Sequence, residues 1–198
     1  MASDANETAV SKPKQLVEVM GRHAGWIALQ AGIAGGADVI LLPEIPYDPE
    51  KVAAAIRRRE TFGAKFSIVV VAEGAKPIGG SHTIREAARA GYVERLGGVG
   101  IVLAEQLEEM TGREARCVVL GHLQRGGGPT AFDRVLATRF GGAAVELIQR
   151  GVFGKMVANN PPDIVPIPLA DVVGRTKTVP LDSDLIKTAR AIGVALGD

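Results

Sequence analysis

The sequence predicts an α/β protein with a Rossmann-like parallel sheet and helices on both faces, and three observations lead to this prediction. Short apolar runs of about four to seven residues alternate with longer segments of helical periodicity. The runs lack the polar alternation of a half-exposed strand, as is typical of strands covered on both faces. Glycine is frequent, with 25 residues among 198, which suits many tight turns between strands and helices.

The predicted strands are apolar runs that end at a glycine, a proline or a polar residue. Gly21 follows the first run, Pro43 follows the second, and Glu73 follows the third. Branched aliphatic residues dominate the later runs, as expected of strands. The three later runs are expected to be buried. The predicted strands cover residues 16–20, 38–42, 66–72 and 115–120.

The predicted helices carry local start signals as well as periodicity. Asp48 and Pro49 suit the cap and first turn of one helix. Thr130 with Asp133 three residues later resembles a capping box at the start of another. The predicted helices cover residues 23–32, 49–60, 97–110, 130–150 and 182–196.

Other segments are less regular in pattern. Ile101, Leu103 and Leu107 are expected on the apolar side of the helix over residues 97–110. Residues 76–92 are polar and glycine-bearing, which predicts a loop with at most a short helix. Residues 156–180 hold prolines and short β-branched runs, which favours an irregular β segment before the C-terminal helix.

Composition limits the classes of function. The net charge is +1 and aromatic residues make up 4%, so no electrostatic or stacking footprint for nucleic acid or an anionic membrane is present. The apolar runs are too short to cross a membrane. The single cysteine, Cys117, is interpreted as a small core residue and excludes an intrachain disulfide. We expect a cytoplasmic protein.

Polar residues follow each predicted strand, and in a parallel sheet these positions share one edge. They are Met20–Arg22, Glu44, Glu73, and the pair His122 and Arg125. Each residue alone has an ordinary explanation, such as a surface arginine, a cap or a packing histidine. Their convergence on one edge is the stronger signal for a site.

Arg125 precedes three glycines and the predicted start of a helix at Thr130. Glycines let the backbone approach a ligand closely, and the N–H groups of a helix start favour an anion. An arginine fork adds charge-assisted hydrogen bonds. A glycine-rich turn before a helix is a weak motif by itself, so geometry alone remained the competing interpretation.

Three longer motifs contain most of these polar residues. They are VEVMGRHAGWIAL (residues 17–29), VVVAEGA (residues 69–75) and LGHLQRGGGPTAFDRVLATRFG (residues 120–141). In their order and rough spacing they resemble the sugar-phosphate half of 6-phosphofructokinases, and the sequence is most similar to bacterial enzymes of the actinobacterial kind. The resemblance covers residues 16–198, and the family includes enzymes that use ATP and others that use pyrophosphate.

The resemblance implies roles for individual residues. Arg22 would be catalytic, stabilising the transferring phosphoryl group. Glu73 would bind sugar hydroxyls, and His122 with Arg125 would bind the 6-phosphate. Arg116 would reach the 6-phosphate of a neighbouring subunit, which implies a homo-oligomer. The full set of implied substrate-binding residues is Met20, Gly21, Arg22, Glu73, Arg116, His122, Leu123, Gln124 and Arg125.

The sequence also departs from the family pattern. The family has a further arginine before the first motif, where this sequence reads SKPKQ with Pro13 near the matching place. Lys12 or Lys14 would replace that arginine only as a point charge. The family's donor-phosphate loop and its aspartate run, which supply the base and the Mg²⁺ ligands, have no counterpart. We therefore expect a fragment: a polar leader over residues 1–15 that is disordered or non-native, and a substrate-binding domain over residues 16–198.

In the intact enzyme, Mg²⁺ with ATP or pyrophosphate would complete the reaction, and the present chain is expected to be inactive alone. The alternative is a non-catalytic sugar-phosphate-binding or regulatory module that pairs with another chain. A plain dinucleotide binder is disfavoured because no GxGxxG motif opens a βαβ unit.

Overall fold

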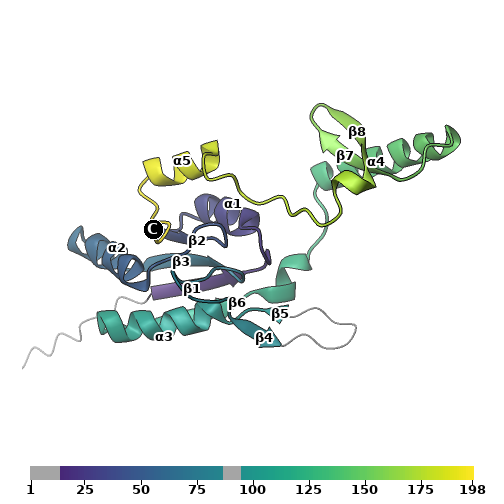
Figure 1. Cartoon of the computed structure of the whole chain (residues 1–198). Coiled ribbons are helices and arrows are strands. Elements are labelled where there is room, and N and C mark those ends of the chain that lie inside the picture. The colour runs from purple at the N-terminus through teal and green to yellow at the C-terminus, as the bar shows by residue number, and fades with distance from the viewer. Residues whose placement is uncertain (1–13, 87–94) are drawn as a thin grey trace, which may run out of the picture. The chain divides into compact units, whose positions relative to one another are not determined.

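The computed structural model describes residues 14–86 and 95–198, which form two compact units (Figure 1). The first unit contains residues up to Gln124 together with Thr178–Asp198, and the second is Arg125–Lys177. Of the leader expected over residues 1–15, only Lys14 and Gln15 belong to the described residues, and both lie in the first strand. The domain division expected from the sequence stays a prediction.

The first unit is built on a four-stranded parallel sheet in the order β2-β3-β1-β6. This confirms the predicted fold class. The strands are β1 (Lys14–Val19), β2 (Val39–Leu41), β3 (Ser67–Ala72) and β6 (Ala115–Val119).

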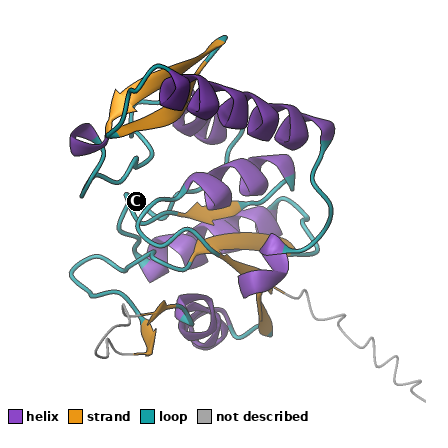
Figure 2. Cartoon of the chain, turned by 90° about the vertical axis from the view of Figure 1, so that its right-hand side faces the viewer, coloured by secondary structure: helices purple, strands orange, loops and turns teal. Residues whose placement is uncertain are grey.

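Helices cover both faces of this sheet, as predicted (Figure 2). Successive residues of β3 alternate between the two cores, because side chains alternate along a strand. Val69 and Val71 pack with α2 (Pro49–Thr61) and α3 (Val99–Thr111). Val70 and Ala72 pack on the opposite face, whose core includes residues of α1 (Trp26–Ala34) and α5 (Asp184–Ala191).

Local signals fix two of these helices. The Asp48 side chain accepts a hydrogen bond of 2.9 Å from the Glu50 N–H, and Pro49 is the first helical residue, as predicted. Helix α3 begins differently, because its N-cap Gly98 has a left-handed backbone with φ of 88°. The buried carboxylate of Glu18 on β1 accepts hydrogen bonds from the N–H groups of Gly98 and Gly100, at 2.8 Å each for the shortest pairs.

Three burial predictions were wrong. Phe66, the first residue of the predicted buried strand over residues 66–72, is 55% exposed and precedes β3. The other two concern the edge of the sheet at β6. Val118 is 55% exposed, because β6 is an edge strand and only its Cys117 side packs against the core shared with α3. Ile101 was expected on the apolar side of α3 but is 47% exposed, since it lies two residues before the buried Leu103. The apolar run over residues 115–120 thus predicted strand β6 correctly, but it did not predict that only one face of this strand is covered.

The segment expected to be a loop over residues 76–92 contains a short strand. Strand β4 (Ile84–Glu86) pairs antiparallel with β5 (Arg95–Leu96). Residues 87–92 of this segment lie outside the described residues. The predicted C-terminal helix is confirmed in type but is shorter than expected, since α5 ends at Ala191 and Ala195 then bridges to Val39 of β2.

The second unit consists of one long helix and a hairpin. Helix α4 (Ala131–Gln149) begins with the predicted capping box, in which Thr130 and Asp133 bond to each other's backbone N–H. The segment expected to be irregular forms a regular antiparallel pair, β7 (Lys155–Asn160) and β8 (Asp163–Pro168), followed by the 3₁₀ turn η2 (Leu169–Asp171). Among the described residues, no helix is both long and apolar enough to span a membrane.

Candidate functional site

The exits of β1, β3 and β6 lie together at one edge of the sheet. The pairing register sets Val19 beside Ala72 and Glu18 beside Val119. The residues that follow each strand, Met20, Glu73 and Leu120, therefore leave the sheet at the same level. The sequence-based expectation that the polar residues after these strands share one edge depends on a parallel sheet, and the structure has such a sheet.

The turn after β1 has an unusual backbone. Arg22 has φ of 49°, the single positive value for a non-glycine residue among the residues described, and Gly21 has φ of 150°. A left-handed backbone is unfavourable for a side chain such as arginine and persists only where surrounding contacts enforce it. The turn thus presents Arg22, which is exposed, from a fixed backbone.

The exit of β3 supplies the contacts that hold this turn. Oε1 of Glu73 accepts hydrogen bonds from the N–H of Gly21 at 3.3 Å and of Arg22 at 3.0 Å. Gly74 follows, and a Cβ added there would lie 1.7 Å from the carbonyl oxygen of Arg22. Only a glycine fits this close approach of two backbones without a shift.

The exit of β6 adds a third contact to the same turn. The side-chain Oε1 of Gln124 accepts a hydrogen bond of 2.7 Å from the N–H of Met20. Gln124 belongs to the 3₁₀ turn η1 (Gly121–Arg125) that follows β6. The structure therefore joins Met20, Gly21, Arg22, Glu73 and Gln124 through backbone and side-chain hydrogen bonds.

Glu44, the polar residue after β2, has a different task. Its carboxylate accepts hydrogen bonds from the N–H of Gly25 at 3.0 Å and of Val179 at 2.7 Å. Gly25 is the N-cap of α1, so Glu44 places a negative charge at the positive end of that helix. Its role is to connect α1 to the chain that returns at Val179.

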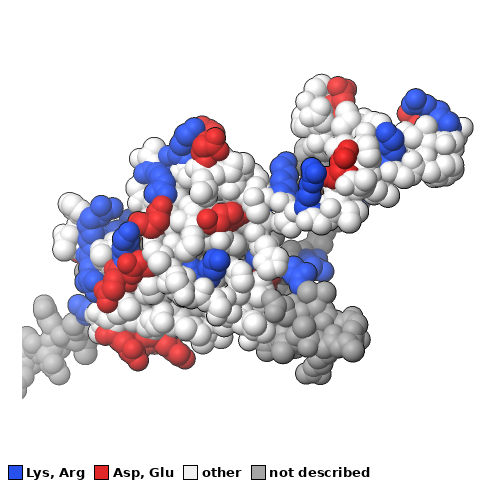
Figure 3. Space-filling model, viewed as in Figure 1, with Lys and Arg blue, Asp and Glu red and all other residues white. Residues whose placement is uncertain are grey.

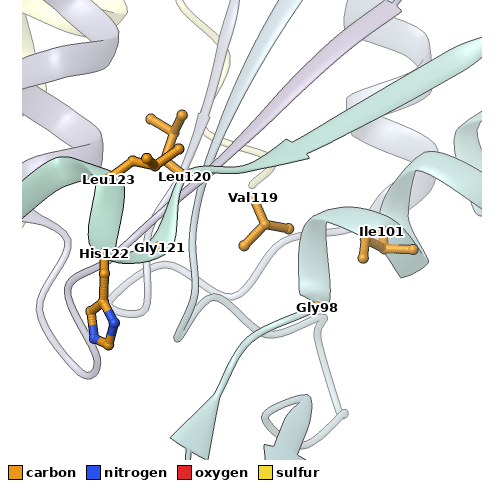
Figure 4. Close-up of a pocket in the computed structure, with 7 residues that line it drawn as sticks. All are labelled: Gly98, Ile101, Val119, Leu120, Gly121, His122 and Leu123. Carbon is orange, nitrogen blue, oxygen red and sulfur yellow. The ribbon is translucent and has the colours of Figure 1, made fainter.

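His122 and Leu123 are exposed on η1, with Leu123 77% exposed. They line an open cavity of about 800 Å³ between η1, the end of β6 and the start of α3 (Figure 4). Its lining is apolar apart from the His122 imidazole. The lining residues are Gly98, Ile101, Val119, Leu120, Gly121, His122 and Leu123.

Arg125 is the first residue of the second unit, and it is exposed. The capping box uses the N–H of Asp133, and hydrogen bonds from Thr130 lower the pKa of the Asp133 carboxyl. A carboxylate already occupies the start of α4, which weakens the expectation that free N–H groups there bind an anion. The positive charge of Arg125 is the remaining attraction for a phosphate in this stretch.

Arg116 lies at the opposite end of β6 from the candidate site. It is paired with Gln15 near the start of β1, and its guanidinium forms an ion pair of 2.7 Å with Glu114. The structure does not bring Arg116 together with the other predicted residues. Lys14 is buried and lies 3.6 Å from Glu60, so it does not offer an exposed charge, while Lys12 and Pro13 lie outside the described residues.

Sequence reasoning missed Glu18, although a lone carboxylate inside the apolar run LVEVM is a signal of a buried polar contact. Glu18 is 2% exposed and connects β1 to the start of α3 beside the cavity. Burial, with a contribution from the Glu18 charge, raises the pKa of the Cys117 thiol to about 11. The thiol is therefore protonated near neutral pH, which supports its interpretation as a core residue.

The arrangement offers an arginine on a rigid turn, a carboxylate behind it, and a histidine on an exposed turn. Such groups suit the binding of a phosphorylated, hydroxyl-bearing ligand. On the face of the first unit that is seen in Figure 3, positive and negative side chains are interspersed. Within residues 14–86 and 95–198, no three His, Cys, Asp or Glu side chains gather to hold a metal ion.

Comparison with known proteins agrees with this description. Residues 2–148 match the family model described as phosphofructokinase. The whole chain is 52% identical to an ATP-dependent 6-phosphofructokinase of Chloroflexus aurantiacus and covers 55% of that protein. It is 56% identical over 83% of its length to a pyrophosphate–fructose 6-phosphate 1-phosphotransferase of Amycolatopsis methanolica, of which it covers 48%.

A solved structure gives the same result. The crystal structure of a pyrophosphate-dependent phosphofructokinase from Nitrosospira multiformis superposes with a TM-score of 0.72 at 28% identity. The match covers 96% of this chain and 50% of the other. The chain spans about half the length of the relatives that it matches.

Proposed function

Because this chain belongs to the phosphofructokinase family, we propose that it carries the fructose 6-phosphate site of a 6-phosphofructokinase. The proposed reaction of the whole protein transfers a phosphoryl group from ATP or pyrophosphate to the 1-hydroxyl of fructose 6-phosphate. The product is fructose 1,6-bisphosphate, and the step belongs to glycolysis. One observation supports the proposal most: Glu73 and Gln124 hold the Met20–Arg22 turn from the exits of the two strands that flank β1.

Each proposed role follows from the chemistry of the side chain. Arg22 provides a cation for the charge that spreads over the phosphoryl oxygens in the transition state. Its fixed backbone favours this role, because preorganised charge does not have to reorient during the reaction. Glu73 accepts hydrogen bonds from sugar hydroxyls, and His122 with Arg125 binds the 6-phosphate.

The phosphoryl donor, the catalytic base and the Mg²⁺ ligands are not assigned to the described residues. The side chains of the described residues do not form a set of three metal ligands. Arg116, which faces away from the site, is proposed to serve a neighbouring subunit in a homo-oligomer. The proposed location is the cytoplasm.

Binding of fructose 6-phosphate to this chain, followed by calorimetry, tests the proposal. The wild-type chain is expected to bind. Arg125→Ala is expected to raise the dissociation constant about 10- to 100-fold, because a charge-assisted hydrogen bond contributes about 1.5–3 kcal/mol. Arg150→Ala is the control, since Arg150 is an exposed arginine at the far end of α4. Absence of binding by the wild type would contradict the proposal.

An activity assay separates binding from turnover. With Mg²⁺ and either ATP or pyrophosphate, this chain alone is expected to form no fructose 1,6-bisphosphate, because no described residue is assigned as the base. Measurable turnover would show that a base is present in the chain and would overturn that assignment.

A further inference from the structure

Hydrogen bonds connect the exits of three strands in series. Gln124 on the η1 turn binds the backbone of Met20, and Glu73 after β3 binds the backbone of Gly21 and Arg22. The family resemblance assigns Gln124 to the sugar phosphate, but in this structure its oxygen is used by the backbone of the arginine turn. The contact lies between residues 104 positions apart in the sequence.

We propose that Gln124 is a positioning residue that couples the 6-phosphate turn to the arginine turn. A phosphate bound at His122 on η1 would restrain this turn and, with it, the Gln124 side chain. The Gln124 oxygen then restrains the Met20 N–H, and the backbone passes this restraint to Arg22. This inference rests on the proposed function, because it deepens the role of the same site.

The backbone of Arg22 explains why such a restraint matters. Its left-handed conformation needs support, and Glu73 and Gly74 provide it from the β3 exit. Those contacts fix Gly21 and Arg22, whereas the N–H of Met20 donates to the side chain of Gln124 at the β6 exit. Gln124 is therefore the contact through which η1 acts on the turn.

A glutamine side chain suits this task better than a carboxylate. Its amide oxygen accepts from Met20, while its NH₂ group remains a donor. A glutamate would accept the same hydrogen bond but would bring a negative charge to a turn that binds a phosphate. The oxygen can thus be tested separately from the amide nitrogen.

Amide NMR spectra of the full chain test the coupling, with fructose 6-phosphate as the probe. In the wild type, the ligand is expected to shift the amide signals of His122 and of Met20–Arg22. In Gln124→Ala, the His122 shift should remain, the Met20–Arg22 shifts should fall, and hydrogen exchange at Met20 should accelerate at least about tenfold. In Gln124→Glu, slow exchange at Met20 should return, because the carboxylate oxygen accepts the same bond. Gln30→Ala, an exposed glutamine on α1, is the control.

The outcomes distinguish this inference from the proposed function. A wild-type chain in which no amide responds contradicts the proposed function and the coupling with it. A wild-type response at Met20–Arg22 that is equally large in Gln124→Ala overturns the coupling and leaves the proposed function standing. If Gln124→Ala does not fold, Gln124→Glu decides: protection of Met20 supports the coupling, and its loss overturns it.

Discussion

Strands β1 and β6 are hydrogen-bonded neighbours in one parallel sheet, yet they are fixed in different ways. Strand β1 is central, carries the buried Glu18, and ends in a turn that is held on two sides. Strand β6 lies at the edge, is covered on one face, and ends in an exposed turn. The central strand therefore presents a rigid arginine, and the edge strand presents an accessible histidine. Both properties are useful in one binding site.

Removal of the Glu18 side chain should have the largest effect. Glu18→Ala leaves the buried N–H of Gly100 and the half-buried N–H of Gly98 without their acceptor, which is expected to lower the free energy of unfolding by about 3 kcal/mol. Urea denaturation measures the loss. Glu105→Ala on the same helix is the control, because Glu105 is exposed.

A small loss in Glu18→Ala, comparable to that in Glu105→Ala, would contradict the view that β1 is fixed through this carboxylate. Glu18→Gln sharpens the test. The amide oxygen keeps one acceptor for these N–H groups, so the loss should lie between those of the other two variants.

The covered face of β6 should show an intermediate effect at Cys117. Burial raises the pKa of this thiol to about 11, so little thiolate forms at pH 8. The rate at which the thiol is alkylated should rise as the pH approaches the raised pKa. Alkylation by iodoacetamide at pH 8 should be at least about tenfold slower than in the urea-unfolded chain. The unfolded chain is a matched control, because it contains the same single cysteine. Equal rates in both states would show that α3 does not cover this face.

The open face of β6 should show the smallest effect. Arg116→Ala removes an exposed ion pair with Glu114 and is expected to change the free energy of unfolding by less than about 0.5 kcal/mol. Urea denaturation measures it beside Glu18→Ala. A loss above 1 kcal/mol, taken as roughly twice the expected limit, would mean that β6 is fixed as firmly as β1.

Much of this fold could be predicted because its signals are local. The caps at Asp48 and Thr130 depend on a few adjacent residues, and the strand predicted over residues 66–72 depends on the apolar run at residues 68–72. The family and the parallel sheet followed from such patterns. The prediction of an irregular segment over residues 156–180 was partly wrong. Its prolines suggested interrupted strands, but a two-stranded hairpin tolerates proline because both of its strands are edge strands.

The rest depends on the register between distant segments. Arg116 alternates with Cys117 in β6 and lies on the same face as Val118, so it is one local sign of an open face that β3 lacks. The coverage itself depends on which helices reach each strand. In the same way, Gln124 could be placed near the site from the sequence. Its bond to the backbone of Met20 could not, because that bond requires the pairing of β1 with β6.

The first unit is interrupted in the sequence, and this has a consequence for synthesis on the ribosome. Glu44 is made 135 residues before its partner Val179, and the core on the α1 face also needs Ile186 and Leu196. A nascent chain that has reached Lys177 has all four strands of the parallel sheet and α1, but it lacks α5 and the last residues, which complete the cover of one face. During this interval the growing protein exposes apolar surface, which makes it a substrate for chaperones and prone to aggregation.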